Sequence, residues 1–365
     1  MNLFKKLYIF IFALIIASGS LIIYRSIPGP RQYEFRSSEP KPDVFSAEFY
    51  KNFDANNLER SLKDYLLRDR SVRFNAFMDK YIFKRPFVNN VYAKGPNIYD
   101  FSDDDAYHLG DAGYTEIDKS VSRLKDIQDY LEENGVKFLV IPVPKISSVY
   151  NYPDYVLNPE KVDIMYAKYL KDKLDKAGIS NVYLRDELKY EDFYKTDHHI
   201  TKTGGDKIIN AIDEYLKTFG DGLLPAKIDT KLSHFKGSRS RRMAYWTGTD
   251  ELQIPIYNTP YKRESAGGDA INNFDQNMTY GGYMCGDMSY DSIVTDNDGA
   301  DIVIYGDSFT NIVESFIWPR VKRMRSYDLR NESSKDLERA IDTDVVILIA
   351  DEHSFRLGKE YIFYK

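Results

Sequence analysis

The feature that most constrains the fold is an alternation, after about residue 110, of segments with helical periodicity and continuous apolar runs. Apolar residues recur at helical spacing between residues 117 and 131, and the run VKFLVIPV follows at 136–143. A strand that is apolar on both faces is typical of a parallel sheet covered by helices on either side. The pattern therefore predicts a three-layer α/β domain with a mostly parallel sheet.

The same alternation continues along the chain. Helical spacing recurs at 162–174 and 208–216, and four apolar runs predict further strands: NVYL (181–184), DIVIYGDSF (301–309), VKRMRSYDL (321–329) and DVVILIADE (344–352). From about 218 to 299 the composition shifts to Tyr, Asn, Gly and Asp, and apolar residues show little periodicity. This predicts an irregular insertion or lid near the functional site. Each aromatic residue is expected in the core by default, but some in this segment could instead stack on sugar rings: Tyr245, Trp246, Tyr257, Tyr261 and Tyr280.

The first 44 residues favour an exported protein. The stretch LYIFIFALIIASGSLIIY at 7–24 carries no charge and follows Lys5 and Lys6, which predicts a single-pass membrane anchor with a cytoplasmic N-terminus. Small residues at 17–19 also suit a cleaved signal peptide, so both alternatives stay open. We expect an anchor or signal peptide at 1–25, an extracytoplasmic spacer at 26–44 and one domain at 45–365, held at the cell membrane or secreted.

Composition excludes one class of function. The formal net charge is -6, which provides no basic footprint for nucleic acid. The chain has one cysteine, Cys285, so it has no disulfide within the chain.

The stretch YGDSFT at 305–310 places Ser308 where an apolar strand ends and a helix begins. Open α/β sheets bind their ligands at this end of their strands. Gly306 allows a sharp turn, and the N–H groups that open the helix could face an oxyanion, with Asp307 and Asn311 as supporting residues. The alternative is an ordinary polar turn.

A serine hydroxyl needs a base, and the base needs a group that orients it. The stretch TDHHIT at 196–201 offers both, because Asp197 and His199 project to the same side of an extended chain, with His198 as a supporting residue. The alternative is a polar turn that caps the following helix, with Thr201 or Thr203 as N-cap.

Two other interpretations compete for these residues. His353 follows the apolar strand at 344–352 and is a rival base. His198, His199 and a carboxylate could bind zinc, but adjacent His side chains diverge and the spacing of a zinc-binding helix is missing, so we expect neither a metal nor a cofactor.

Together these motifs resemble the DHHW family, which is related to the SGNH-hydrolase-like domains of alginate O-acetyltransferases of the AlgJ and AlgX type. The resemblance runs from about residue 45 to the C-terminus and includes NNVYAKGPNIYDF, TDHHIT, FKGS, YGGY and IYGDSF in this order. It implies an SGNH-hydrolase-like (flavodoxin-like) fold, with Ser308 as nucleophile, His199 as base and Asp197 as its orienter. It also implies an acidic residue after the last strand, which Glu352 matches. Ile200 stands where the family motif has Trp.

The expected function is therefore serine-dependent O-acetyl transfer, or ester hydrolysis, on a cell-envelope or secreted polysaccharide by an exported, membrane-tethered protein. By resemblance, a membrane-bound O-acyltransferase would be the partner that donates the acyl group. The alternative is a non-catalytic glycan-binding or scaffold protein of envelope assembly, because fold does not imply function.

Overall fold

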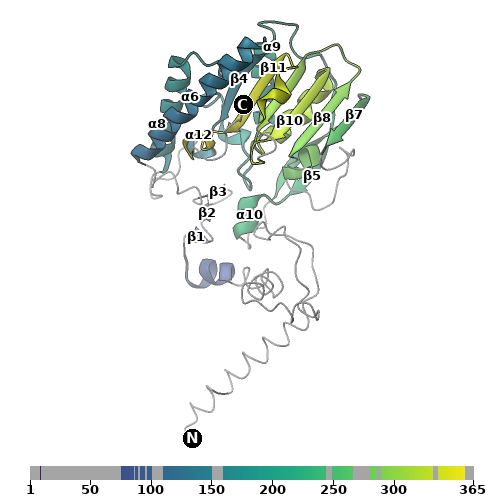
Figure 1. Cartoon of the computed structure of the whole chain (residues 1–365). Helices are drawn as coiled ribbons and strands as arrows, with labels where there is room; N and C mark the ends of the chain where they lie inside the picture. The colour runs from purple at the N-terminus through teal and green to yellow at the C-terminus, as the bar shows by residue number, and fades with distance from the viewer. Residues whose placement is uncertain are drawn as a thin grey trace, which may run out of the picture. The chain divides into compact units, whose positions relative to one another are not determined.

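The computed structural model describes Ile9 and residues 75–85, 87–88, 91–94, 97–100, 110–149, 159–243, 249–265, 280–285, 289–331 and 336–357 (Figure 1). Among these residues, no helix is long and apolar enough to cross a membrane. The expected anchor at 7–24, apart from Ile9, and the expected spacer at 26–44 lie outside the described residues.

The chain divides into two compact units. One comprises Met1–Ile98 with Ser238–Thr247, and the other comprises Tyr99–Gly237 with Gly248–Lys365. The first unit contains a small apolar core of Val91, Ile98 and Met243. Its described elements include η1 (Met78–Ile82), β1 (Phe87–Val88), β2 (Val91–Lys94), the start of β3 (Asn97–Asp100) and α10 (Ser238–Met243).

A six-stranded sheet organises the second unit, in the order β4-β11-β9-β10-β8-β7. The strands are β4 (Lys137–Val143), β7 (Tyr261–Ser265), β8 (Tyr290–Thr295), β9 (Asp301–Gly306), β10 (Arg323–Asp328) and β11 (Val345–Asp351). The pairs β4–β11, β11–β9 and β9–β10 are parallel, whereas β10–β8 and β8–β7 are antiparallel. The predicted mostly parallel sheet is confirmed.

Alternate residues of the central strands enter two separate cores. In β4, Leu139 and Ile141 pack with α9 (Lys202–Leu216) and α11 (Thr310–Ile317). Phe138 and Val140 point the other way and pack with α6 (Asp111–Glu133) and α8 (Pro159–Lys176), which lie together on one side of the sheet (Figure 1). This double burial explains the unbroken apolar runs in the sequence. The predicted three-layer arrangement is confirmed.

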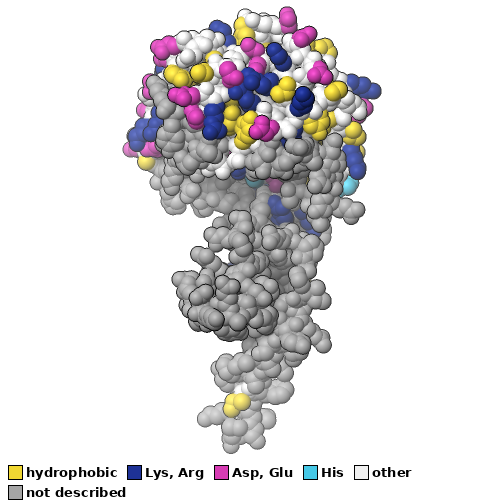
Figure 2. Space-filling view, turned by 45° about the vertical axis from the view of Figure 1, so that its right-hand side comes forward, with side chains coloured by type: hydrophobic (Ala, Val, Ile, Leu, Met, Phe, Trp, Pro, Cys, Tyr) yellow, Lys and Arg dark blue, Asp and Glu magenta, His cyan; other side chains and the backbone are white. Residues whose placement is uncertain are grey.

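Short helical elements connect these layers. They are α7 (Ile146–Val149), η2 (Tyr190–Asp192), η3 (Tyr280–Cys285), η4 (Trp318–Arg320), η6 (Leu337–Ala340) and α12 (Ser354–Leu357). Charged side chains of both signs are interspersed over the face of the described residues that is visible in Figure 2.

Local pattern and structure differ in three places. NVYL forms only an isolated bridge, between Asn181 and Val140, so the strand predicted there is wrong. The helical spacing at 162–174 places Met165 on the core side of α8, but its side chain is 55% exposed. The buried face of α8 contains Tyr166 and Leu170 instead. The segment 218–299 is only partly irregular: it contains the hairpin of β5 (Asp229–Phe235) and β6 (Asp250–Ile256) and supplies β7 and β8 to the main sheet.

Candidate active site

The turn after β9 presents Ser308 at the carboxyl end of a central strand. A Cβ on Gly306 would lie 2.0 Å from the Ile349 carbonyl oxygen of β11, so only glycine fits at this close approach. The Asp307 carboxylate then fixes the turn, because it accepts hydrogen bonds from Phe309 N at 3.0 Å and from Asp351 N at 3.0 Å. Asp307 therefore ties the serine turn to the end of β11.

The segment that carries the two histidines is a closed loop before α9. Phe193 and Ile200 form an antiparallel bridge, and Tyr194 N donates to His199 O at 3.0 Å. Ile200 is fully buried in the core beside α9, so its side chain packs there and lines no exposed surface. Thr201 is the N-cap of α9, with its Oγ1 3.5 Å from Gly204 N. The loop thus caps the helix and presents the histidines at once.

Two further contacts hold the loop from outside. The Asp250 carboxylate accepts from Thr196 N at 2.6 Å and from Thr196 Oγ1 at 2.7 Å. Gly237 N donates to Thr196 Oγ1 at 2.9 Å, and a Cβ on Gly237 would lie 2.5 Å from the Cβ of Asp197. Any larger residue at position 237 would therefore push Asp197 out of place.

A chain of hydrogen bonds connects the two motifs. The Asp197 Oδ1 atom lies 2.5 Å from His199 Nδ1, and His199 Nε2 lies 2.7 Å from Ser308 Oγ. Asp197 and His199 are 2% and 6% exposed, whereas Ser308 is half-buried. A carboxylate at Nδ1 favours the tautomer with its proton there, which leaves Nε2 to accept the Ser308 hydroxyl proton. The structure thus brings together the three residues that the sequence proposes as nucleophile, base and orienter.

Aromatic rings surround the His199 imidazole. The Tyr280 ring is stacked on it with 3.7 Å between centroids and 6° between planes, and the Phe309 ring lies 4.9 Å away. Tyr280 is buried, so it packs in the core and does not present a face to sugar. Sequence reasoning missed this contact because no spacing or periodicity relates Tyr280 to the histidine motif.

His198 occupies the solvent side of the site. Its side chain is 44% exposed, and its Nδ1 lies 3.4 Å from Asp197 Oδ1. Ligand atoms of Asp197, His198 and His199 lie within 4.8 Å of one another, as a metal site would require. Both ring nitrogens of His199 are, however, engaged by Asp197 and Ser308. A cation bound here would have to displace one of these contacts, so the three residues fit a hydrogen-bonded triad better than a metal site.

The other predicted site residues have different surroundings. His353, the rival base, accepts a hydrogen bond at its Nδ1 from Arg356 Nε at 2.8 Å. The histidine that contacts Ser308 is His199. Asn311 is buried in the first turn of α11, where its backbone N–H points to Ser308 O at 3.4 Å.

Glu352 connects the ends of β11 and β4. Its carboxylate accepts from Lys145 N at 3.1 Å and makes a short contact with the Tyr183 hydroxyl. Burial, together with the Glu352 charge, raises the pKa of Tyr183 well above its ordinary value. The acidic residue after the last strand therefore stabilises the sheet edge beside the site.

Comparison with known proteins agrees with this geometry. Residues 101–236 match the family described as the SGNH hydrolase-like domain of the acetyltransferase AlgX. This part of the chain is similar to an SGNH hydrolase-like domain. The matched residues include Asp197 and His199, while Ser308 lies beyond them. The predicted resemblance is thereby confirmed. No curated protein matches the chain.

Solved structures show the same fold. A DHHW family protein from Eubacterium siraeum is 16% identical, with a TM-score of 0.55 over 76% of this chain and 98% of that one. PatB1 of Bacillus cereus, in a structure with a sulfonyl adduct, is 15% identical, with a TM-score of 0.53 over 68% of this chain and 91% of that one. At such identities the likeness concerns the fold.

Proposed function

We propose that this protein transfers or hydrolyses acyl groups, acetyl above all, on a cell-envelope or secreted polysaccharide, with Ser308 as nucleophile. The observation that carries the proposal is the hydrogen-bond chain from Asp197 through His199 to Ser308 at 2.5 and 2.7 Å. The match of the SGNH-like domain to that of an acetyltransferase supports acetyl as the group transferred.

The chain of contacts defines the order of steps. As Ser308 Oγ attacks the ester carbonyl, its proton moves to His199 Nε2, and the Nδ1–H bond to Asp197 stabilises the imidazolium. The Ser308 N–H, near the start of α11, is the donor that we assign to the oxyanion. The carbon–oxygen bond to the leaving alcohol then breaks, and the alkoxide takes the proton from Nε2. Water or a sugar hydroxyl, deprotonated by His199, resolves the acyl-enzyme and releases Ser308.

Transfer requires that a sugar hydroxyl reach the acyl-enzyme before water does. We propose a membrane-bound O-acyltransferase as the acyl donor and the segment 7–24 as the anchor that holds this domain near that partner. An anchored domain outside the membrane would lie close to such a partner and could receive the acyl group from it. The reaction would then need no soluble acyl donor.

The experiment is intact mass spectrometry of the full chain after brief exposure to an activated acetyl ester, and separately to an aryl sulfonyl fluoride. We expect one acetyl group on Ser308 in the wild type and none in Ser308→Ala. His199→Ala should slow acylation by about 10²- to 10⁴-fold. His353→Ala is the matched control, since it removes a histidine at the end of the neighbouring strand, and it should acylate normally.

Two results would overturn this assignment. Acylation at the wild-type rate in His199→Ala would show that His199 is not the base. A wild type that binds acetylated polysaccharide, but neither acylates nor turns over, would point instead to the non-catalytic scaffold, and binding would then survive Ser308→Ala.

A further inference from the structure

The His199 imidazole lies between two other rings. The Tyr280 ring is parallel to it at 3.7 Å, and the His198 ring is tilted by 36° at 3.9 Å. Two rings so close to one centroid must occupy opposite faces, since they would overlap on the same one. Tyr280 is 4% exposed, whereas His198 is half exposed. The base thus has a solvent-side face and a core-side face, and Tyr280 covers the second.

Several contacts fix the Tyr280 ring in place. Tyr283, which is fully buried, lies edge-on to it at 5.4 Å, and Tyr194 lies edge-on at 6.1 Å. The hydroxyl groups of Tyr194 and Tyr283 lie 3.1 Å apart. Each ring restrains the next, so the surface on which the imidazole rests is rigid.

A buried ion pair anchors the same segment to the sheet. Arg263 of β7 donates to Met284 O at 3.0 Å and binds the Asp291 carboxylate of β8 through both Nε and Nη2. Binding of a carboxylate through two N–H groups gives a guanidinium geometric specificity. The backbone that carries Tyr280 is therefore held by β7 and β8 as well as by aromatic packing.

The ring of Tyr280, and not its hydroxyl, faces the base. The hydroxyl is buried near the Ile312 backbone without a hydrogen bond of ordinary geometry among the described residues. Burial raises the pKa of Tyr280 well above its ordinary value, so the hydroxyl is neutral at the pH of the reaction. The electron-rich face of an aromatic ring attracts a cation, and His199 becomes one when it takes the Ser308 proton.

We propose that Tyr280 is a positioning residue for the base. Its ring holds the imidazole in the plane in which Nδ1 meets Asp197 and Nε2 meets Ser308, and its π face stabilises the imidazolium. The titratable groups beside the imidazole are Asp197 and His198 on its own loop and Tyr280, and those that act on Tyr280 are Tyr283, Asp197 and Asp307; the neutral Ser308 hydroxyl lies at Nε2. The kinetic consequences rest on the proposed acyl transfer, whereas the ring geometry does not.

The kinetic test compares Tyr280→Phe, which keeps the ring, with Tyr280→Leu, which removes it. We expect Tyr280→Phe to hydrolyse an activated acetyl ester within about twofold of wild type, and Tyr280→Leu to lose about 5- to 30-fold in kcat. KM should change by less than about twofold, because the stack matters once charge develops. Without the π face the protonated base is less favoured, so the acid limb of the pH–rate profile should move to lower pH.

The matched control is Tyr327→Leu. Tyr327 is also buried, but it packs in the core on the other side of the sheet, so it reports lost packing without contact to His199. Its kcat per folded molecule and its pH profile should equal those of wild type. Wild-type kcat and profile in Tyr280→Leu would overturn the proposal. An equal loss in Tyr280→Phe would also overturn it, since the hydroxyl would then be responsible.

A second measurement needs no turnover. The face of Tyr280 should shift the His199 ring-proton NMR signals upfield in the folded full chain, and His199→Gln identifies those signals. The shift should persist in Tyr280→Phe and vanish in Tyr280→Leu, or in Tyr280→Met if the Leu variant does not fold. Signals at random-coil positions in the wild type would overturn the stack. An upfield shift in a wild type without acyl chemistry would refute the proposed function and leave the positioning of His199 supported.

Discussion

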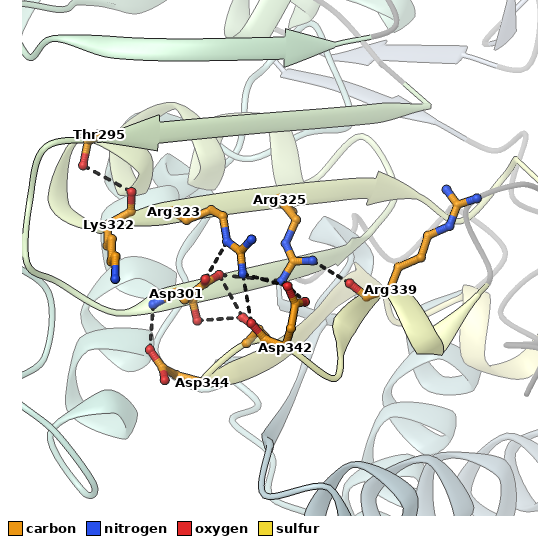
Figure 3. Close-up of polar contacts among 9 residues, drawn as sticks. Thr295, Asp301, Lys322, Arg323, Arg325, Arg339, Asp342 and Asp344 are labelled. Atoms are coloured by element: carbon orange, nitrogen blue, oxygen red, sulfur yellow. Dashed lines mark hydrogen bonds and ion pairs between the residues drawn. The ribbon is translucent and has the colours of Figure 1, made fainter.

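The two ends of β9 carry charged residues that serve opposite purposes. At the amino end, Asp301 joins a cluster of arginines and aspartates (Figure 3). At the carboxyl end, Asp307 and Ser308 follow Gly306 and meet the histidine loop. The same strand therefore has a structural polar cluster at one end and a candidate catalytic one at the other.

The amino-end cluster consists of direct ion pairs. Arg323 Nε lies 2.5 Å from Asp301 Oδ2, and Arg325 Nη2 lies 2.7 Å from Asp342 Oδ1. Asp301 N also donates to Asp344 Oδ2 at 2.8 Å. In Figure 3 the guanidinium groups of β10 point toward these carboxylates. Arg323 and Arg325 both pair with Asp301 and Asp342, so the cluster connects β9, β10 and the approach to β11.

The carboxyl-end cluster is a relay. The Asp197 carboxylate contacts an imidazole, which contacts a half-buried hydroxyl, so the line of contacts ends on a group that a substrate can reach. Parallel strands direct their carboxyl ends to the ligand side of such a sheet. The comparison teaches that the partners of an aspartate separate a structural site from a reactive one.

The largest effect should come from Asp197→Asn. The amide keeps the size of the carboxylate but removes the charge that holds the proton on His199 Nδ1, so kcat/KM for ester hydrolysis should fall by about 10²- to 10⁴-fold. Thermal unfolding should change far less than activity. A variant that retained wild-type turnover would show that the carboxyl-end cluster is merely structural.

At the other end, Asp301→Asn should damage stability and spare activity. The amide of Asn has one acceptor oxygen where the carboxylate has two, so it cannot accept from both Arg323 Nε and Thr343 Oγ1, and the free energy of unfolding, measured by urea titration, should fall by about 1–3 kcal/mol. The matched control is Asp344→Asn, an exposed member of the same cluster, which should stay within about 0.5 kcal/mol. Turnover per folded molecule should be unchanged in both, and a selective loss of turnover would contradict the division between the two ends.

Two carboxylates of the amino-end cluster should respond to pH in opposite directions. Burial raises the pKa of Asp301 above its ordinary 3.8, so its contribution to stability is complete below pH 3.8 and is lost as the pH rises through the raised value. Burial alone would also raise the pKa of Asp342, but Arg325 and Arg323 outweigh it and lower the pKa, so its contribution is present above pH 3.8 and is lost on acidification.

Urea titrations of Asp301→Asn and Asp342→Asn from pH 3 to 7 test these signs. The free-energy cost of Asp301→Asn should be larger in acid than at neutral pH, and that of Asp342→Asn should be larger at neutral pH. Parallel pH dependence in the two variants would show that one of the assigned environments is wrong.

The smallest effect should come from His198→Gln, which distinguishes the two neighbouring histidines. His198 is 44% exposed and contacts Asp197 only at 3.4 Å, so kcat/KM for the acetyl ester should fall by less than about tenfold. A loss as large as that of His199→Ala would mean that the solvent-side histidine acts as the base.

Local pattern in the sequence determined much of this protein. The apolar runs of β4, β9 and β11 and the helical spacing of α6 and α9 report burial on two faces or on one stripe, which neighbouring residues encode directly. The chemistry of Asp197, His199 and Ser308 was also readable, because few residue types can activate a hydroxyl.

Tertiary structure alone decided which of these residues meet. His199 and Ser308 are 109 positions apart, and their contact depends on the β9–β11 pairing that Gly306 permits. The choice of His199 over His353 and the stack of Tyr280 arise in the same way. Periodicity in the sequence indicates only the local environment of each residue. Contacts across long loops depend on the order in which the strands pair. The reactive groups could therefore be found in the sequence, whereas the sheet brings them together.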